Sequence, residues 1–222
     1  MAPKLGMQPI RQAQIIEATL RCIAETGLRN VTIQAVADRA GVSKGIVNHY
    51  FENKRDLLLK SFSTLLESVG QLAMASYDQR MSPLEMLDLI TDAVFAPASL
   101  IERADRASLP HLSLTPGEAA NIVIQFYARC LFDAEFHALL RKQYQGYETE
   151  IVRVIEWGMQ TGQFKMDISP VRVAHGYMAL YDGLLLYHAL GVDFTTMEES
   201  RELCREYLRK MLCEDREVRV YE

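Results

Sequence analysis

The stretch that decides the fold runs from Thr32 to Leu58 and reads TIQAVADRAGVSKGIVNHYFENKRDLL. Its first part places apolar side chains at positions 33, 36, 37 and 40, which is the spacing of one face of an α-helix. Thr32 can cap that helix, and Gly41 interrupts it. Ser43 can cap a second helix, so the turn between the two is very short. The pattern therefore predicts two short helices that cross at a steep angle.

The second short helix is predicted to have an apolar and a polar face. Ile46, Val47 and Tyr50 are expected to pack inward. The residues left to face outward are Ser43, Lys44, Asn48 and His49. Lysine can reach the acceptors of guanine, asparagine can pair with adenine, and serine can bond either a base or a phosphate. This face is therefore a candidate for the major groove of double-stranded DNA.

Residues around this helix are suited to the phosphate backbone. Gly45 would let the helix come close to a strand, and Lys54 begins the next helix beside Arg55. The exposed amide end of the helix capped by Thr32 could bind a phosphate as well. The alternative interpretation is that the two short helices fill a corner of an ordinary domain and that Lys44 and Lys54 are solvated.

Charge is divided unevenly along the chain. The formal net charge of the 222 residues is -5, which by itself argues against a nucleic-acid binder. Residues 1–60, however, hold nine Lys and Arg against five Asp and Glu, whereas the remainder holds 15 against 24. A basic head on an acidic body is typical of a module that binds a polyanion and is joined to a part with another function.

Composition and motifs exclude several classes of protein. Hydrophobic residues make up 49% and charged residues 24%, as in ordinary folded proteins. No apolar run approaches the roughly 18 residues of a membrane span, and a secretory signal is missing, so a cytoplasmic location is expected. The four cysteines lack a Cys-x-x-Cys pair, which argues against zinc and disulfides. We expect no metal, no cofactor and no catalytic site.

Helix signals recur along the chain and strand signals are nearly absent, so an all-α fold is expected. Capping boxes begin at Ser82, Thr115 and Thr196. Glycines that fall just past apolar-periodic segments are expected to end helices; they are Gly27, Gly70, Gly162 and Gly191. The expected helices lie near 9–26, 32–39, 43–50, 54–78, 82–103, 116–131, 134–161, 169–190 and 196–213.

Two domains are expected. Residues 1–55 would form a helix-turn-helix DNA-binding domain, and residues 56–222 a larger helical domain for effector binding and dimerisation. The segment 104–115 has the least regular pattern and is predicted to be an irregular connection.

The stretch from Thr32 to Leu58 resembles the signature of the TetR family of bacterial transcriptional regulators. Its most specific letters are Ala37, Gly41-Val42-Ser43, Gly45, His49-Tyr50-Phe51, Lys54 and Leu57-Leu58. The resemblance implies that the helix from Ser43 enters the major groove and that Tyr50 and Lys54 approach phosphates. Asn48 stands where the family usually has tyrosine, which makes it a candidate for a base contact. The residues expected to contact DNA are Arg11, Thr32, Gln34, Ser43, Lys44, Gly45, Asn48, His49, Tyr50 and Lys54.

The start of the chain is similar to one branch of that family, the choline-responsive BetI type. This likeness covers the residues from Pro3 to Arg11, then Gly45-Ile46 and His49-Tyr50-Phe51, and it weakens beyond residue 60. It implies a repressor whose effector resembles choline.

The helix expected over 169–190 is apolar on more than one side, so it needs burial on two faces. The family resemblance implies that this helix and the last one pair with their copies as a four-helix bundle in a homodimer. The residues expected at the dimer interface are Tyr181, Gly183, Leu184 and Leu208, with Gly183 allowing close approach. The alternative is the core of an ordinary monomer.

Aromatic residues gather in the middle of the chain, with acids near them in sequence. The residues expected to bind a ligand are Phe95, Tyr127, Trp157 and Tyr177, and the acids are Asp88, Asp92, Glu148 and Glu156. Each aromatic face attracts a cation by about 0.5–2 kcal/mol, so a cationic amine is a suitable ligand.

The function expected from these features is a homodimeric repressor that a small-molecule effector releases from a palindromic operator. Two alternatives stay open at this point. One is a redox-responsive regulator that uses Cys130 or Cys204. The other is an enzyme that uses a pocket in the body.

Overall fold

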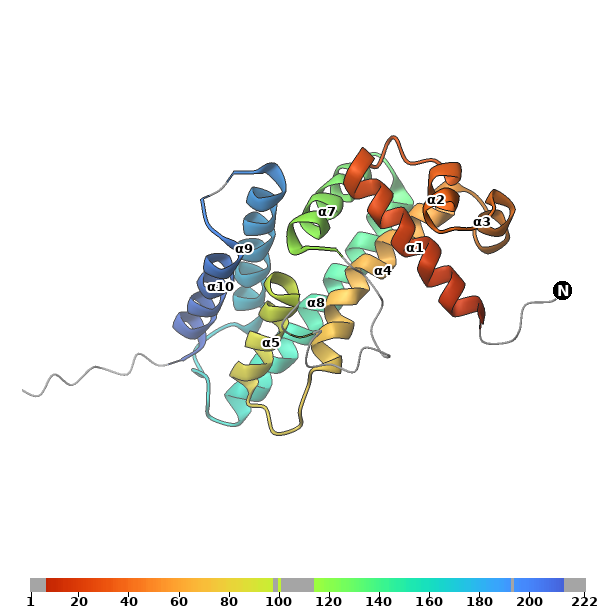
Figure 1. Cartoon of the computed structure of the whole chain (residues 1–222). Coiled ribbons are helices and arrows are strands. Elements are labelled where there is room, and N and C mark those ends of the chain that lie inside the picture. The colour runs from red at the N-terminus through yellow and green to blue at the C-terminus, as the bar shows by residue number, and fades with distance from the viewer. Residues whose placement is uncertain (1–6, 98–99, 101–113, 193, 214–222) are drawn as a thin grey trace, which may run out of the picture.

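A computed structural model describes residues 7–97, 100, 114–192 and 194–213 of the chain. Within these ranges it has nine α-helices with described bounds and no β-strand, which confirms the expected all-α fold (Figure 1). The helices are α1 (Met7–Thr26), α2 (Ile33–Arg39), α3 (Lys44–Tyr50), α4 (Lys54–Ala75), α5 (Pro83–Phe95), α7 (Pro116–Cys130), α8 (Ala134–Gln160), α9 (Pro170–Leu190) and α10 (Met197–Leu212). None of these helices is long and apolar enough to cross a membrane.

All three predicted capping boxes are present. In the box that begins α5, the Glu85 amide donates to the Ser82 hydroxyl oxygen at 3.3 Å, and the Ser82 amide donates to the Glu85 carboxylate at 2.7 Å. The same reciprocal pair begins α7 at Thr115 and α10 at Thr196. Each box satisfies backbone donors that the first turn leaves unpaired, so these helix starts are determined locally.

Three of the four glycines expected to end helices do so, and the prediction for Gly70 is wrong. Gly27, Gly162 and Gly191 have φ angles of +83°, +72° and +66°, in the left-handed region that favours glycine. Gly70 lies inside α4. Its neighbours Leu72 and Ala73 are buried, and the burial of this face outweighs the roughly 1 kcal/mol that glycine costs within a helix.

The helix expected over 82–103 ends earlier, because α5 stops at Phe95. Ala96 has φ -134° and ψ 48°, outside the helical region. Pro97 follows, and a proline disfavours the helical conformation of the residue before it. The connection expected over 104–115 lies outside the described residues, apart from Leu114 and Thr115.

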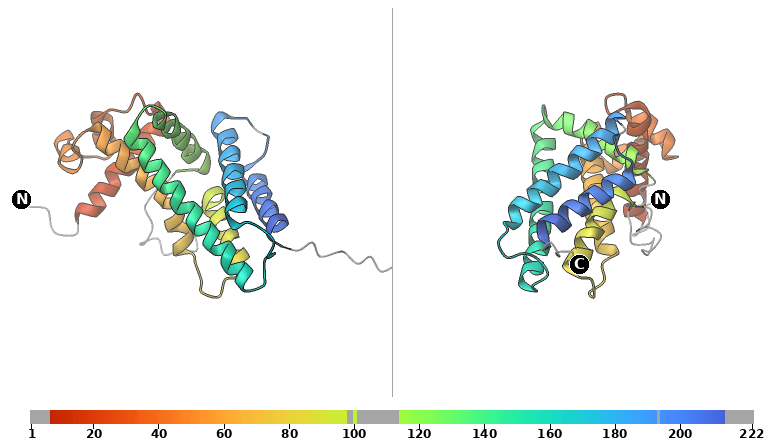
Figure 2. Two further views of the ribbon diagram at one scale, coloured as in Figure 1. Left: turned by 180° about the vertical axis from the view of Figure 1, so that it is seen from behind. Right: turned by 90° about the vertical axis from the view of Figure 1, so that its left-hand side faces the viewer.

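The helices form a basic head and a larger body (Figure 1). Helices α1, α2 and α3 make the head at one end, and α9 and α10 lie at the opposite end. Helix α4 begins in the head and runs into the body, where α5, α7 and α8 surround it (Figures 1 and 2). Helix α4 thus connects the head to the body without a break.

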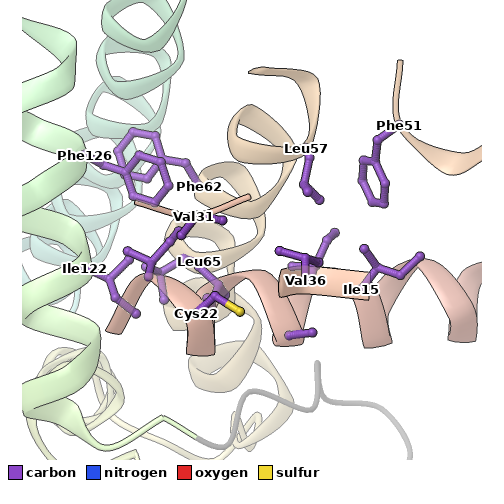
Figure 3. Packing of buried hydrophobic residues seen from close by; sticks show 14 of the residues in the cluster. Ile15, Cys22, Val31, Val36, Phe51, Leu57, Phe62, Leu65, Ile122 and Phe126 are labelled. Carbon is purple, nitrogen blue, oxygen red and sulfur yellow. The ribbon is translucent and has the colours of Figure 1, made fainter. Parts of the chain in front are cut away.

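One hydrophobic cluster belongs to both head and body (Figure 3). Phe62 of α4 stacks on Phe126 of α7 with 4.4 Å between ring centroids, and Phe136 of α8 packs beside both. The cluster continues through buried residues of α1, α2 and α3, among them Val36 and Val47. The predicted domain boundary after residue 55 falls in the first turn of α4, within this shared packing, and stays a prediction.

A second cluster holds the body together, and helices α5, α8, α9 and α10 contribute to it. Tyr177 of α9 is fully buried there, and its hydroxyl lies 2.8 Å from the hydroxyl of Thr91 on α5. A side chain at Gly176 would collide with the ring of Tyr207, so this glycine allows α9 and α10 to approach closely within one chain.

The shared cluster predicts a large effect of Phe126→Ala. Removing a buried phenylalanine ring leaves a cavity, and we expect the free energy of unfolding to fall by about 3–5 kcal/mol in urea denaturation. Head and body should still unfold in one transition, because they share this core. Phe132→Ala is the control, since Phe132 is 88% exposed and its loss should change stability by less than about 0.5 kcal/mol. Two separate transitions in the wild type would contradict the shared core.

Candidate nucleic-acid interface and ligand cavity

The turn between α2 and α3 has the tight geometry that the sequence predicts. The Thr32 hydroxyl oxygen accepts from the Ala35 amide at 3.1 Å, and the Ser43 hydroxyl oxygen accepts from the Ile46 amide at 3.3 Å. Gly41, with φ +63°, reverses the chain between these two caps. Two caps and one glycine, all local in sequence, thus define where α2 ends and α3 begins.

Helix α3 turns one face to the head core and the other to solvent. Val47 is fully buried, and Lys44, Gly45, Asn48 and His49 are exposed together with the cap Ser43. Ile46 is 39% exposed, so the expectation that it packs inward is wrong. A helix of two turns has room for few inward positions, and Val47 and the half-buried Tyr50 occupy them.

The other residues expected to contact DNA lie on α1, at the start of α2 and in its first turn, and at the start of α4. Thr32 caps α2, and the Gln34 amide group donates to Asp38 at 2.7 Å. The Lys54 ammonium lies at the start of α4, where it donates to the Arg29 carbonyl at 3.4 Å. Arg11 lies on α1 and donates to Gln14 at 3.1 Å.

Arg55, next to Lys54, faces the body and not the outer surface of α3. Its guanidinium lies 2.6 Å from Asp133 and also pairs with Glu135 at the start of α8. The hydrogen bond from Arg55 lowers the pKa of Asp133 to about 2. A phosphate contact by Arg55 would therefore have to break this pair.

The body contains a partly open cavity of about 150 Å³ among α4, α5, α7, α8 and α9. Most of its lining is aliphatic, and its polar residues are three tyrosines, a serine and a threonine. The residues that line it are Leu65, Leu66, Ser68, Val69, Leu72, Ala93, Val94, Pro97, Leu114, Thr115, Pro116, Ala119, Ala120, Val123, Tyr127, Tyr147, Tyr181 and Leu185.

A carboxylate lies behind the tyrosine side of this cavity. The Tyr144 hydroxyl donates to both oxygens of Asp182, at 2.8 and 2.7 Å. The Tyr127 hydroxyl lies 3.4 Å from the same carboxylate and also bonds the hydroxyl of Tyr144. Burial raises the pKa of Asp182 to about 6, although the hydrogen bonds from the two tyrosines act in the opposite direction. A negative charge is thus kept beside aromatic rings at neutral pH.

Of the four residues expected to bind a ligand, only Tyr127 lines the cavity. Phe95 and Tyr177 are buried in the second hydrophobic cluster instead, and the partly buried Trp157 packs against that cluster. The apolar periodicity of a helix does not show which ring lines a cavity and which packs against another side chain.

Three of the four acids expected near the ligand are engaged elsewhere, and the fourth, Glu156, is exposed. Asp88 pairs with Arg209 at 2.8 Å and Asp92 with Arg205 at 2.6 Å, which ties α5 to α10. Glu148 pairs with His175 at 2.9 Å. The acid beside the cavity is Asp182, which the sequence reading missed. Its signal was a lone charge within the apolar run of α9.

The predicted dimer residues are buried within the single chain, except Gly183. Tyr181, Leu184 and Leu208 are less than 9% exposed because they pack in the core of their own chain, and a role for them in a dimer stays a prediction. The two apolar helices α9 and α10 bury these side chains against the rest of the body. The apolar residues that α9 and α10 leave exposed are Val171, Leu186, Tyr187, Leu190, Leu203 and Met211.

The two cysteines considered for redox sensing lie in the interior of the chain. Cys130 and Cys204 are buried, and burial raises the pKa of both thiols, that of Cys204 to about 12. The reactive thiolate is therefore scarce at neutral pH, which argues against the redox alternative. In the described part of the chain no three His, Cys, Asp or Glu side chains gather as a metal site.

Two family descriptions match the chain. Residues 15–60 match bacterial regulatory proteins of the tetR family, and residues 97–213 match the C-terminal domain of BetI-type transcriptional repressors. The HTH-type transcriptional regulator BetI of Pectobacterium atrosepticum is 31% identical over 214 residues, which are 95% of this chain and 98% of that protein. The similarity thus extends far beyond residue 60, where the sequence reading expected it to weaken.

Solved structures share the fold. A putative transcriptional regulator from Saccharomonospora viridis in complex with choline has a TM-score of 0.74 at 20% identity, covering 93% of this chain and 99% of that one. The transcriptional regulator FadR from Bacillus subtilis in complex with stearoyl-CoA has a TM-score of 0.67 at 21% identity, covering 88% and 96%.

The raised pKa of Asp182 predicts that this residue lowers stability. A carboxyl whose pKa is higher in the folded than in the unfolded state opposes folding above its unfolded pKa, and the penalty vanishes at lower pH. Asp182→Asn should therefore raise the free energy of unfolding by about 1–3 kcal/mol at pH 8 and by little at pH 4. Urea denaturation at both pH values measures this. Asp167→Asn, at an exposed position, is the control, and an Asp182→Asn protein no more stable at pH 8 would contradict the assignment.

Proposed function

Because the chain belongs to the TetR family of bacterial regulatory proteins and has a BetI-type C-terminal domain, we propose that it represses transcription as a homodimer that a small cationic effector releases from DNA. The function as a transcriptional repressor follows from membership of this family. The DNA contacts, the dimer and the effector are proposed from the geometry of this chain. A repressor of bacterial genes acts in the cytoplasm, and the proposal includes no catalytic step.

Helix α3 is proposed to read the major groove. Its outer face offers Lys44, Asn48 and His49 to base edges, and Gly45 leaves room for a close backbone. Lys54 and the amide end of α2 flank that face and are suited to phosphates. One such helix covers few base pairs, so a two-fold dimer on half-sites about 34–36 Å apart, or a multiple of that, is needed for useful affinity.

The dimer is proposed to form through the outer faces of α9 and α10. Both helices leave apolar residues exposed there, including Leu186 and Leu190 on α9 and Leu203 on α10. Space is open around Gly183 on α9, so a second helix can approach it closely. These helices lie at the end of the body away from α3, so pairing there leaves the reading faces of both heads free (Figure 1).

The effector is proposed to be a small cation with an apolar body. Asp182 and the rings of Tyr127 and Tyr181 give one side of the cavity a negative potential, and the remaining lining is mostly aliphatic. The cavity is also smaller than the roughly 300–1,000 Å³ of sites for drug-sized ligands. Choline, bound by the structural neighbour from Saccharomonospora viridis, has this chemistry. The single observation that carries the proposal is the partly buried Asp182 carboxylate, which accepts hydrogen bonds from the tyrosines.

The effector releases DNA by favouring one arrangement of the two heads over another. A ligand shifts such an equilibrium only by the difference in its affinity for the two states, which is typically 1–3 kcal/mol in allosteric proteins. Operator affinity then falls by the same factor by which operator DNA weakens effector binding.

Substitutions on α3 test the reading face. Lys44→Ala and Asn48→Ala should each weaken binding to operator DNA by about 1–3 kcal/mol, and binding to random DNA by clearly less, because base contacts discriminate between sequences. Fluorescence anisotropy on DNA flanking the gene and on a scrambled duplex measures both. Lys142→Ala, on the exposed surface of α8, is the matched control. Equal losses on both duplexes would show that these residues contact phosphates and not bases.

Choline tests the effector class. At 100 times its Kd it should stabilise the protein against unfolding by about 2.7 kcal/mol, which a thermal shift detects. Its affinity, measured by calorimetry, should fall about five- to tenfold between pH 8 and pH 5, because protonation removes the charge of Asp182, whose pKa is about 6. Asp182→Asn should bind choline at least tenfold more weakly and lose this pH dependence, whereas Asp167→Asn should keep both. Tighter binding by a neutral isostere of choline would refute a cationic effector.

A further inference from the structure

Helix α7 lies between the cavity and the DNA-reading head. One of its faces lines the cavity through Ala119, Val123 and Tyr127. The adjoining face carries Ile122 and Phe126, which are fully buried in the cluster shared with α1 and α4, where Ile122 and Phe126 are labelled in Figure 3. An occupant that displaces α7 therefore pushes against head residues directly, because packed interiors shift between discrete arrangements rather than deform continuously.

Two polar contacts align α7 with α1. Arg21 pairs with Glu118 at 2.9 Å, and the Leu28 amide donates to the side-chain oxygen of Gln125 at 2.6 Å. The first contact lies on α1 and the second in the turn just after it, while on α7 the two contacts are two helical turns apart. The Arg21–Glu118 pair is partly exposed to solvent, and exposed pairs constrain a structure only weakly.

The contact of Gln125 is of a different kind. It holds the backbone of the turn after α1, where Gly27 has φ +83° and a side-chain carbon at Gly27 would lie 3.5 Å from the Gln125 oxygen. This turn leads through the buried Val31 to Thr32, the cap of α2. The amide group of Gln125 in turn donates to Asn121 at 2.7 Å, which orients its oxygen towards Leu28.

We propose that α7 carries occupancy of the cavity to the helix-turn-helix, and that Gln125 is the positioning residue through which α7 holds the turn before α2. The inference rests on the proposed function, since it takes the cavity to be the effector site. Gln125 touches neither effector nor DNA in this scheme. Its loss should uncouple the two sites while leaving each able to bind.

The test compares two substitutions of one side chain. Gln125→Met keeps its length and removes the acceptor oxygen, and Gln125→Glu keeps an acceptor for the Leu28 amide. Gln160→Met, at the exposed end of α8, is the matched control. Operator affinity is measured by anisotropy with and without choline, and choline affinity is measured separately by calorimetry.

Choline should lower operator affinity at least tenfold in the wild type, in Gln125→Glu and in Gln160→Met. In Gln125→Met the factor should fall below threefold, while choline affinity and choline-free operator affinity stay within threefold of the wild type. An undiminished choline effect in Gln125→Met overturns the proposal, as does equal uncoupling in Gln125→Glu.

A second arm needs no effector. Ala119→Leu extends a larger side chain from α7 into the cavity, and Ala119→Val, a smaller change, is made in parallel so that a folded variant is available. Filling the cavity should lower operator affinity at least fivefold, and adding Gln125→Met should remove that loss. If choline does not bind the wild type, choline is excluded as the effector of the proposed function. The cavity-filling variants alone then test the role of α7. An equal loss with and without Gln125→Met, or no loss in either filled variant, overturns the role of α7.

Discussion

The stacking of Phe62 on Phe126 is the contact on which the arrangement of the two functions depends. It joins α4, which begins in the DNA-reading head, to α7, which lines the cavity. Were head and body separate domains on a linker, a ligand in one would have no mechanical route to the other. Because they share one core, the position of α7 and the position of the head depend on the same side-chain packing.

The partly buried Asp182 carboxylate is placed at a cost to stability. A carboxylate beside an apolar cavity is costly to desolvate, and its raised pKa reports that cost. Hydrogen bonds from Tyr144 and Tyr127 offset part of the penalty and fix the direction of the carboxylate. A chain selected for stability alone would place an amide or an apolar residue there, so the charge points to a ligand.

Charge in the head is organised more finely than its net value suggests. Some of its basic residues hold the head together or bind it to the body, through the pairs Arg39–Glu25, Arg21–Glu118 and Arg55–Asp133. Lys44 remains exposed on the outer face of α3. The basic excess thus serves two purposes: it supports the interface with the acidic body and leaves cations beside the proposed DNA surface.

Local patterns in the sequence determined the all-α fold, the capping boxes and the turn around Gly41, because caps and positive φ angles depend on neighbours a few residues away. They also predicted the exposed face of α3 and indicated the family to which the chain belongs. Tertiary structure alone decided which apolar faces meet. Phe95 and Tyr177 became core and Trp157 packed against it, while Tyr127 met the cavity, and Leu208 was buried within its own chain. Helical periodicity marks a face as buried but carries no information on whether another helix, a second chain or a cavity covers it, because that depends on contacts between segments far apart in sequence.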